Sequence, residues 1–170
     1  IIVSGATASG KTAYALELAH QHKTQIISAD SRQCYKELNI GVAKPSIAQL
    51  HAVHHYFINS HSITDDVNVT VFERYALEAV YKVFETNDVA VMAGGTGLYI
   101  KAFCEGIDEI PATDEKLRAT INKSYKIGGI DWLIDEIKKV DSKYFVSGEI
   151  QNPQRMMRAL EVKLSSGKSI

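Results

Sequence analysis

GATASGKT, residues 5–12, is the stretch that decides the fold of this chain. It overlaps the end of a short β-rich run, Ile1–Gly5, and is followed by the helical apolar spacing of Thr12–His22. A strand, a glycine-rich loop and a helix in this order match the Walker A pattern. The glycines let the loop wrap closely around phosphate oxygens, and the helix N-terminus presents partial positive charge to them. The sequence therefore predicts a phosphate-binding loop, which we call the Walker A segment.

The side chains at the end of this segment have distinct expected roles. Lys11 adds a full positive charge beside the phosphates, and the Thr12 hydroxyl is the expected ligand of Mg²⁺. The rest of the phosphate contact is expected from the loop itself, namely Gly5, Ala6, Thr7, Ala8, Ser9 and Gly10. The motif predicts a di- or triphosphate ligand and does not indicate which one.

Two further buried strands are predicted at Gln25–Ala29 and Asp88–Ala93, with helical segments between them. Continuous apolar strands that alternate with helices favour an α/β fold of the P-loop NTPase type, a parallel sheet with helices on both faces. Ligands of such folds bind at the carboxyl ends of the strands. Asp30 and the turn Gly94–Gly97 follow strands, so we expect both to lie beside the Walker A segment.

Three local features lie between those strands. Ser46 is expected to cap a short helix that ends near residue 53, and His54–Asn59 is expected to be extended. Thr70 and Glu73 have the spacing of a capping box, in which two side chains satisfy the free N–H groups at a helix start. The paired histidines of His54–Asn59 would point to opposite sides, which favours packing over metal binding.

After Pro111 the pattern changes to helices alone. The predicted domains are therefore a P-loop catalytic core at 1–110 and a helical subdomain at 111–170. Asn152 is expected to be the N-cap of the last helix, and Gly167 follows its end. The chain starts inside an apolar run and stops soon after a helix end, so we expect it to be part of a longer protein. The expected helices are Asp114–Tyr125, Asp131–Val140 and Pro153–Ser166.

The composition is that of a soluble globular protein, with 45% apolar and 23% charged residues. The apolar runs are far shorter than the roughly 18 residues that a membrane-spanning helix needs, so we expect a cytoplasmic protein. The net charge of −1 argues neither for nor against a nucleic-acid partner, although residues 112–170 carry 11 Lys and Arg against 8 Asp and Glu. Cys34 and Cys104 show no metal-ligand spacing.

Asp30 and two arginines of the last helix each allow two interpretations. Asp30 either caps the next segment or acts on the ligand, by holding a metal-bound water or as a general base. Arg155 and Arg158 lie on one helical face, where they either clamp phosphates or pair with Glu161 and solvent. The Gly94–Gly97 turn is expected of any tight connection from a strand to a helix.

Read in order, these segments resemble the tRNA dimethylallyltransferase family, also called the IPP transferase or tRNA isopentenyltransferase family. Their order and spacing match over essentially the whole chain. Arg32, Val53 and Asn152 depart from the usual residues of the family, at positions outside the proposed chemistry. The matching stretches are GATASGKT (5–12), IISADSRQCY (26–35), IGVAKP (40–45), HHYFI (54–58), AGGTGLYIKAFCEG (93–106) and NPQRMMRALEV (152–162).

The resemblance implies a prenyl transfer rather than a phosphoryl transfer. The Walker A segment would hold the diphosphate of dimethylallyl diphosphate, and Asp30 would accept a proton from adenine N6 as that nitrogen attacks the allylic carbon. The acceptor would be adenosine 37 in the anticodon loop of tRNAs that read codons beginning with U, and pyrophosphate would leave. Members are also described as ATP-binding, which we interpret as inherited from the motif.

The resemblance also implies a tRNA-binding surface and a partial chain. The family's C-terminal part, which completes the catalytic domain, lies beyond Ile170, so we expect a truncated enzyme that is a monomer. An adenylate isopentenyltransferase acting on free AMP or ATP, and a P-loop small-molecule kinase, stay open as alternatives. The tRNA contacts carried over are Asp30, Ser31, Arg32, Gln33, Thr96, Arg118, Gln154, Arg155, Met156, Met157 and Arg158.

Overall fold

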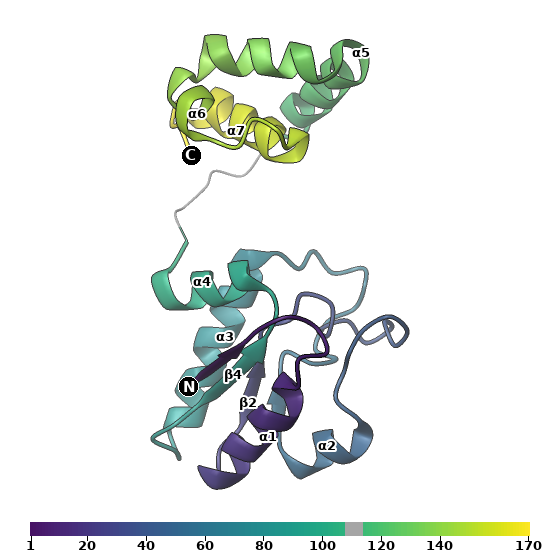
Figure 1. Ribbon diagram of the computed structural model, residues 1–170, viewed down its shortest axis with the longest axis vertical. Helices are drawn as coiled ribbons and strands as arrows, with labels where there is room; N and C mark the ends of the chain where they lie inside the picture. Colours follow the sequence, from purple (N-terminus) through teal and green to yellow (C-terminus); the bar gives the residue numbers. More distant parts are fainter. Residues whose placement is uncertain (108–113) are drawn as a thin grey trace. The chain divides into compact units, whose positions relative to one another are not determined.

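The computed structural model describes residues 1–107 and 114–170 (Figure 1). The chain divides into two compact units, with the division after Ile107. The first unit holds a sheet with helices, and the second is helical. The predicted domain boundary at residue 111 lies outside the described residues.

The first unit is built on a parallel sheet of four strands. The strand order is β1-β4-β2-β3, and all three pairs of neighbours run parallel. The order places β4 between β1 and β2, so the carboxyl ends of these strands lie side by side. This confirms the predicted parallel sheet of an α/β fold. The strands are β1 Ile2–Ser4, β2 Ile26–Ser28, β3 His55–Tyr56 and β4 Val91–Gly94.

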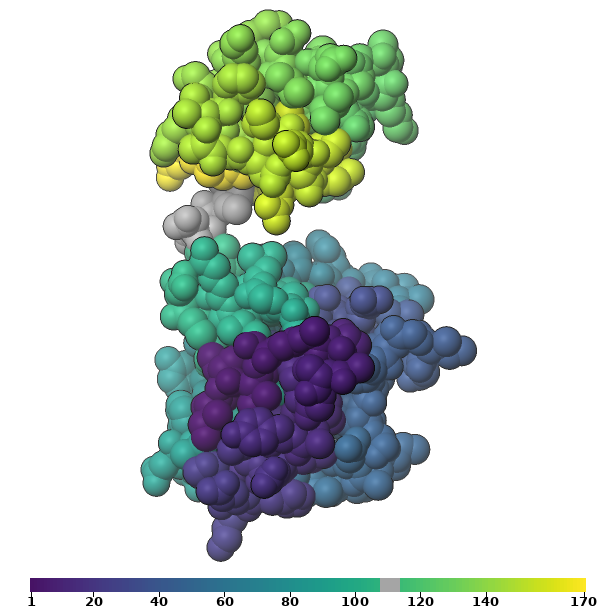
Figure 2. Space-filling view, viewed as in Figure 1, coloured from purple at the N-terminus to yellow at the C-terminus, as the bar shows by residue number. Residues whose placement is uncertain are grey.

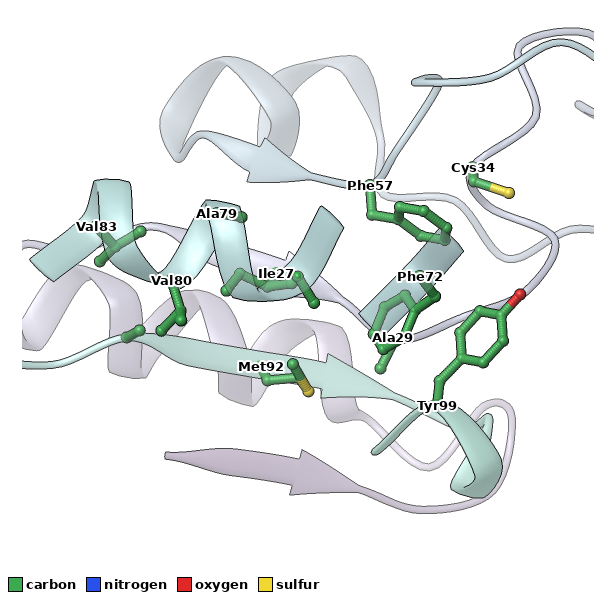
Figure 3. Close-up of a cluster of buried hydrophobic side chains, with 12 residues drawn as sticks. Ile27, Ala29, Cys34, Phe57, Phe72, Ala79, Val80, Val83, Met92 and Tyr99 are labelled. Atoms are coloured by element: carbon green, nitrogen blue, oxygen red, sulfur yellow. The ribbon is translucent and has the colours of Figure 1, made fainter. Parts of the chain in front are cut away.

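Helices cover both faces of this sheet because successive strand residues point to opposite sides. Ile26 of β2 packs in a cluster with the buried alanines of α1, whereas Ile27 packs with those of α3. Figure 3 shows the second cluster, in which side chains of α3 meet Ile27 and Met92. The predicted arrangement of helices on both faces is confirmed. The helices are α1 Lys11–Gln21, α2 Ile47–Ala52, α3 Val69–Phe84 and α4 Gly97–Glu105.

Two helix starts differ in how well the sequence predicted them. Ser46 caps α2 in a capping box with Gln49, and the predicted cap is confirmed. The predicted capping box at Thr70 is wrong, because α3 begins at Val69 and its N-cap is Asn68. The Asn68 side chain accepts hydrogen bonds from the N–H groups of the second and third helical residues, as an N-cap side chain does.

The strand predicted over His54–Asn59 is longer than the strand observed. The segment His54–Asn59 is extended only at His55–Tyr56, because Phe57 and Asn59 adopt the left-handed conformation, with φ of 62° and 51°. β1 lies at an edge of the sheet, and Ile1 and Ile2 are 52% and 42% exposed. The strands β2 and β4 are buried as predicted, since each has neighbours on both sides.

The second unit is a helical bundle with its own core. The two helices predicted at 114–125 and 131–140 correspond to the two parts of α5, which are separated by the non-helical Gly129, where φ is 65°. The sequence missed the short helix α6. It predicted the last helix correctly, including the Asn152 N-cap and the left-handed Gly167. No helix in the two described ranges has the length and apolar character to span a membrane. The helices are α5 Glu115–Val140, α6 Ser142–Ser147 and α7 Pro153–Ser166.

Candidate active site

A cavity of about 390 Å³ opens at the carboxyl ends of the strands in the first unit. It is lined by the Walker A segment from residue 7 to residue 12, by Asp30 and Gln33 after β2, and by Gly94–Gly95 at the end of β4. The far side is formed by the loop 43–45 with residues of α2 and β3. The first ten residues, which include most of the Walker A segment, are largely exposed (dark purple in Figure 2).

The Walker A segment forms a tight loop between β1 and α1. Gly10 is the N-cap of α1 in the left-handed conformation, with φ of 86°, and Ala8 shares that conformation with φ of 63°. The Ser9 N–H donates to the Ala6 carbonyl at 3.3 Å, which closes the turn. The Lys11 amine also donates to that carbonyl, so its charge lies over the loop. Thr12, the second residue of α1, is half-buried and lines the cavity.

Asp30 is held at the cavity by a turn that uses its own carboxylate. Its Oδ1 accepts the Arg32 N–H at 2.9 Å, and the Ser31 N–H donates to Thr96 Oγ1 at 3.1 Å. Thr96 in turn donates its N–H to the Ala29 carbonyl at 3.1 Å. The turn after β4 is thus bonded to the segment after β2. The prediction that Asp30 and the Gly94–Gly97 turn lie beside the Walker A segment is confirmed.

Gln33 connects the segment after Asp30 to the opposite wall of the cavity. Its Oε1 accepts the Ser28 hydroxyl at 3.0 Å, and its Nε2 donates to the Ala43 carbonyl at 2.8 Å. Both ends of the amide therefore have partners within the protein. Gln33 therefore links β2 to the loop 40–45 through two hydrogen bonds, and we call this link the Gln33 brace.

Four of the candidate tRNA residues of the second unit form two groups. Arg118 donates through Nε to Glu161 Oε1 at 3.0 Å, and Arg158 donates through Nη1 to Oε2 of the same carboxylate at 3.1 Å. Burial alone would raise the pKa of Glu161, but the hydrogen bonds from both arginines outweigh it and lower that pKa. Met156 and Met157 are 0% and 6% exposed and belong to the core. We therefore remove these two methionines from the predicted contact surface.

The comparison with protein families decides the classification. The family model described as IPP transferase matches residues 33–170, a range that includes the Gln33 brace, the Thr96 turn and helix α7. The chain belongs to the IPP transferase family.

Curated relatives of this IPP transferase family member match it from end to end. The tRNA dimethylallyltransferase of Cytophaga hutchinsonii is 41% identical over 170 residues, which is 100% of this chain and 56% of that protein. The one of Christiangramia forsetii is 42% identical over 168 residues, 99% of this chain and 56% of that protein. The chain thus spans about half the length of the curated relatives that it matches.

Solved structures of the same family share the fold. The full-length tRNA isopentenylpyrophosphate transferase of Bacillus halodurans has a TM-score of 0.61 and 28% identity, over 98% of this chain and 55% of that chain. A eukaryotic dimethylallyltransferase acting on tRNA has a TM-score of 0.79 over 99% of this chain and 42% of that chain. Its 20% identity supports the fold alone.

The sequence missed several residues of the cavity in this IPP transferase chain. Lys44, Gln49 and His55 all line it, and the first and last lie in stretches that carry the family resemblance. The imidazole of His55 bonds through Nδ1 to the Val53 carbonyl at 2.8 Å, and burial lowers its pKa, because burial disfavours the charged form. The pattern of paired histidines could not reveal that only the second one faces the cavity.

Proposed function

We propose that this chain carries the donor site of a tRNA dimethylallyltransferase, which transfers a dimethylallyl group from dimethylallyl diphosphate to N6 of adenosine 37 in tRNA. The observation that carries the proposal is the meeting of the Walker A segment, Asp30 and the Thr96 turn around one cavity. The names of the curated relatives and the family support the same reaction. Dimethylallyl diphosphate and an anticodon stem-loop are the proposed partners.

The Walker A segment stabilises the leaving group. Breaking the carbon–oxygen bond of an allylic diphosphate leaves negative charge on the departing pyrophosphate. The N-terminus of α1 presents unpaired backbone N–H groups and partial positive charge to that anion. The Lys11 amine, which bonds to the Ala6 carbonyl of the same loop, turns toward the diphosphate and adds a full charge.

Asp30 acts as the general base on the acceptor amine. An exocyclic adenine amine is a weak nucleophile whose proton becomes acidic as the new carbon–nitrogen bond forms. Asp30 lines the same cavity as the Walker A segment, and its Oδ1 bond to the Arg32 N–H fixes the carboxylate in place. The proton from N6 passes to Asp30, and the electron pair of the cleaved bond leaves with the pyrophosphate.

The donor set of the cavity fits a magnesium ion. Mg²⁺ takes few protein ligands, keeps several waters and is completed by substrate phosphates. The Thr12 hydroxyl and the Asp30 carboxylate, both oxygen donors, line one cavity, and the described residues contain no cluster of three His, Cys, Asp or Glu side chains that would favour another metal. We propose Thr12 as the protein ligand. When bound, the ion would neutralise charge on the diphosphate.

Each unit carries its own proposed tRNA surface. In the first unit it comprises Ser31, Arg32 and Gln33 around Asp30, and in the second it comprises the exposed Gln154 and Arg155 at the start of α7. Extrusion of the target base toward Asp30 agrees with the general behaviour of enzymes that modify a base. The pair Arg118 and Arg158 belongs to the proposed surface of the second unit, held in orientation by Glu161.

The deciding experiment supplies one donor and three acceptors. Because the chain spans about half of its relatives, the assay uses the full-length gene product. It is incubated with Mg²⁺, dimethylallyl diphosphate and either unmodified tRNA, AMP or ATP, and both pyrophosphate release and adenine N6 alkylation are measured. We expect prenylated tRNA only. Prenylated AMP would identify an adenylate isopentenyltransferase, and ATP hydrolysis without prenylation would point to a kinase.

Asp30→Asn tests the base within that assay. The amide still accepts the Arg32 N–H but cannot take a proton, so we expect the single-turnover rate to fall at least about 10²-fold while diphosphate binding stays unchanged. The exposed Asp66→Asn is the matched control, with wild-type rates expected. Unchanged turnover of Asp30→Asn would remove Asp30 as the base.

A further inference from the structure

Lys44 holds together three segments that surround the cavity. Its Nζ donates to the Tyr35 carbonyl at 2.6 Å, to Asn59 Oδ1 at 2.6 Å and to Asn39 Oδ1 at 3.3 Å. Tyr35 lies in the segment after Asp30, Asn39 lies before the loop 40–45, and Asn59 follows β3. An ammonium group has three N–H donors, so these three acceptors use its full capacity.

The same segments are tied together by two further bonds. The Gln33 side chain donates to the Ala43 carbonyl at 2.8 Å, and the Gln33 carbonyl accepts the Asn59 N–H at 3.1 Å. Lys44 and Ala43 both line the cavity, as the Walker A segment does. The position of this part of the cavity lining therefore depends on the Lys44 ammonium and on the Gln33 amide.

The acceptors of Lys44 are all neutral. Within the described ranges its amine forms no ion pair with a carboxylate, so its charge is held by amide and carbonyl oxygens alone. A lysine whose three donors are already bonded has none left for a phosphate. Its contribution to the site is therefore made through the groups that it holds, and not by contact with the ligand.

We propose that Lys44 is a positioning residue for the prenyl transfer, which holds the loop 40–45 against the segment after Asp30 and so sets the width of the cavity between the acceptor base and the donor. This inference rests on the proposed function. A displacement of about 1 Å between reacting groups costs on the order of 10²-fold in rate. The Walker A segment makes no bond to Lys44, so diphosphate binding does not depend on it.

The test compares Lys44→Met with Lys36→Met in the full-length gene product. Methionine keeps the apolar stem and removes the charge and all three donors, whereas Lys36 is exposed and lies in the same stretch of chain. We expect Lys44→Met to lower kcat about 10²-fold with a dissociation constant for dimethylallyl diphosphate within about threefold of wild type. We expect Lys36→Met to match the wild type in both. A wild-type kcat for Lys44→Met would overturn the proposal.

Two substitutions of Asn59 distinguish the effect of its hydrogen bond with Lys44 from the effect of the Lys44 charge. They also test the proposal if Lys44→Met does not fold. Asn59→Gly suits the φ of 51° and removes one acceptor, so we expect kcat to fall about tenfold with unchanged donor binding. Asn59→Asp keeps the acceptor and cancels the charge, so we expect kcat within about threefold of wild type. A loss of kcat in Asn59→Asp with wild-type kcat in Asn59→Gly would show that the charge matters and not the hydrogen bond, and would overturn the proposal.

Measuring the dissociation constant of the donor and the alkylation of tRNA separately distinguishes a failure of this inference from a failure of the proposed function. If the wild-type enzyme alkylates no tRNA, the proposed function fails, whatever the Lys44 variants do. If the wild type alkylates tRNA and Lys44→Met loses donor affinity together with kcat, the transfer reaction stands and the positioning role is wrong.

Discussion

Gly94→Ala should open the sheet at the candidate active site. Gly94 ends β4 and faces the end of β2, where a Cβ atom would lie 2.1 Å from the Ala29 carbonyl oxygen. Ordinary van der Waals contact begins at 3.4 Å, so the two backbones must separate by 3.4 − 2.1, or about 1.3 Å. Neither group can rotate away because both belong to buried main chain, and Ala29 is 0% exposed.

The cost follows from the bonds at that point. The Ala29 N–H donates to the Ala93 carbonyl at 2.8 Å, and the Ala29 carbonyl accepts the Thr96 N–H at 3.1 Å. A separation of about 1.3 Å breaks both bonds, at about 1 kcal/mol each, and overpacking strain adds about 1 to 3 kcal/mol. We expect a loss of about 3 to 5 kcal/mol in the free energy of unfolding of the first unit.

Hydrogen exchange of the full-length protein, followed by mass spectrometry, measures this loss locally. Each 1.4 kcal/mol is about tenfold, so amides of β2 and β4 that exchange through unfolding of the first unit should exchange about 10²-fold to about 4 × 10³-fold faster. Peptides from α5 and α7 should not change. Gly97→Ala is the matched control, because its Cβ would meet no atom within 4 Å, and we expect wild-type exchange or slightly slower. Exchange of β2 and β4 within about threefold of wild type in Gly94→Ala would refute the close approach of the two strands.

Two further predictions concern the caps and charges. Asn68→Ala should destabilise the first unit by about 1 kcal/mol, because the N-cap of α3 is lost. Thr70→Ala should cost at most about a few tenths of a kcal/mol. The urea unfolding midpoints of the two variants measure both changes. A larger loss of stability in Thr70→Ala than in Asn68→Ala would identify Thr70 as the cap. Glu161→Gln should lower the melting temperature of the second unit at pH 7, because two arginines lose their carboxylate partner. The folded-state pKa of Glu161 is lowered, so its contribution is present above the unfolded pKa of about 4.3 and disappears as the pH falls through the folded pKa. The melting temperatures of the wild type and of Glu161→Gln should therefore converge as the pH falls from 7 to 3. A difference between the two melting temperatures that does not change with pH would contradict the role of the carboxylate.

The sequence by itself determined the phosphate loop and the class of fold. A Walker A motif between a strand and a helix is a local pattern, since the glycines, Lys11 and Thr12 are neighbours in the chain. The buried strands β2 and β4 and helix α7, with its Asn152 cap, follow from apolar periodicity and capping chemistry, which also act over a few residues. The roles assigned to Asp30 and to the tRNA residues came from family resemblance and stay predictions.

Only the tertiary structure decided which distant residues share the site. The bond from Ser31 to Thr96 joins residues 65 apart in the chain, and the bond from Lys44 to Asn59 joins residues 15 apart, so no local pattern encodes them. Burial separated Met156 and Met157 from the exposed start of α7, because it depends on what packs against a helix face. The place of β4 between β1 and β2 in the described sheet also depends on the tertiary structure, since strand order is set by crossover connections and not by the strands' own residues.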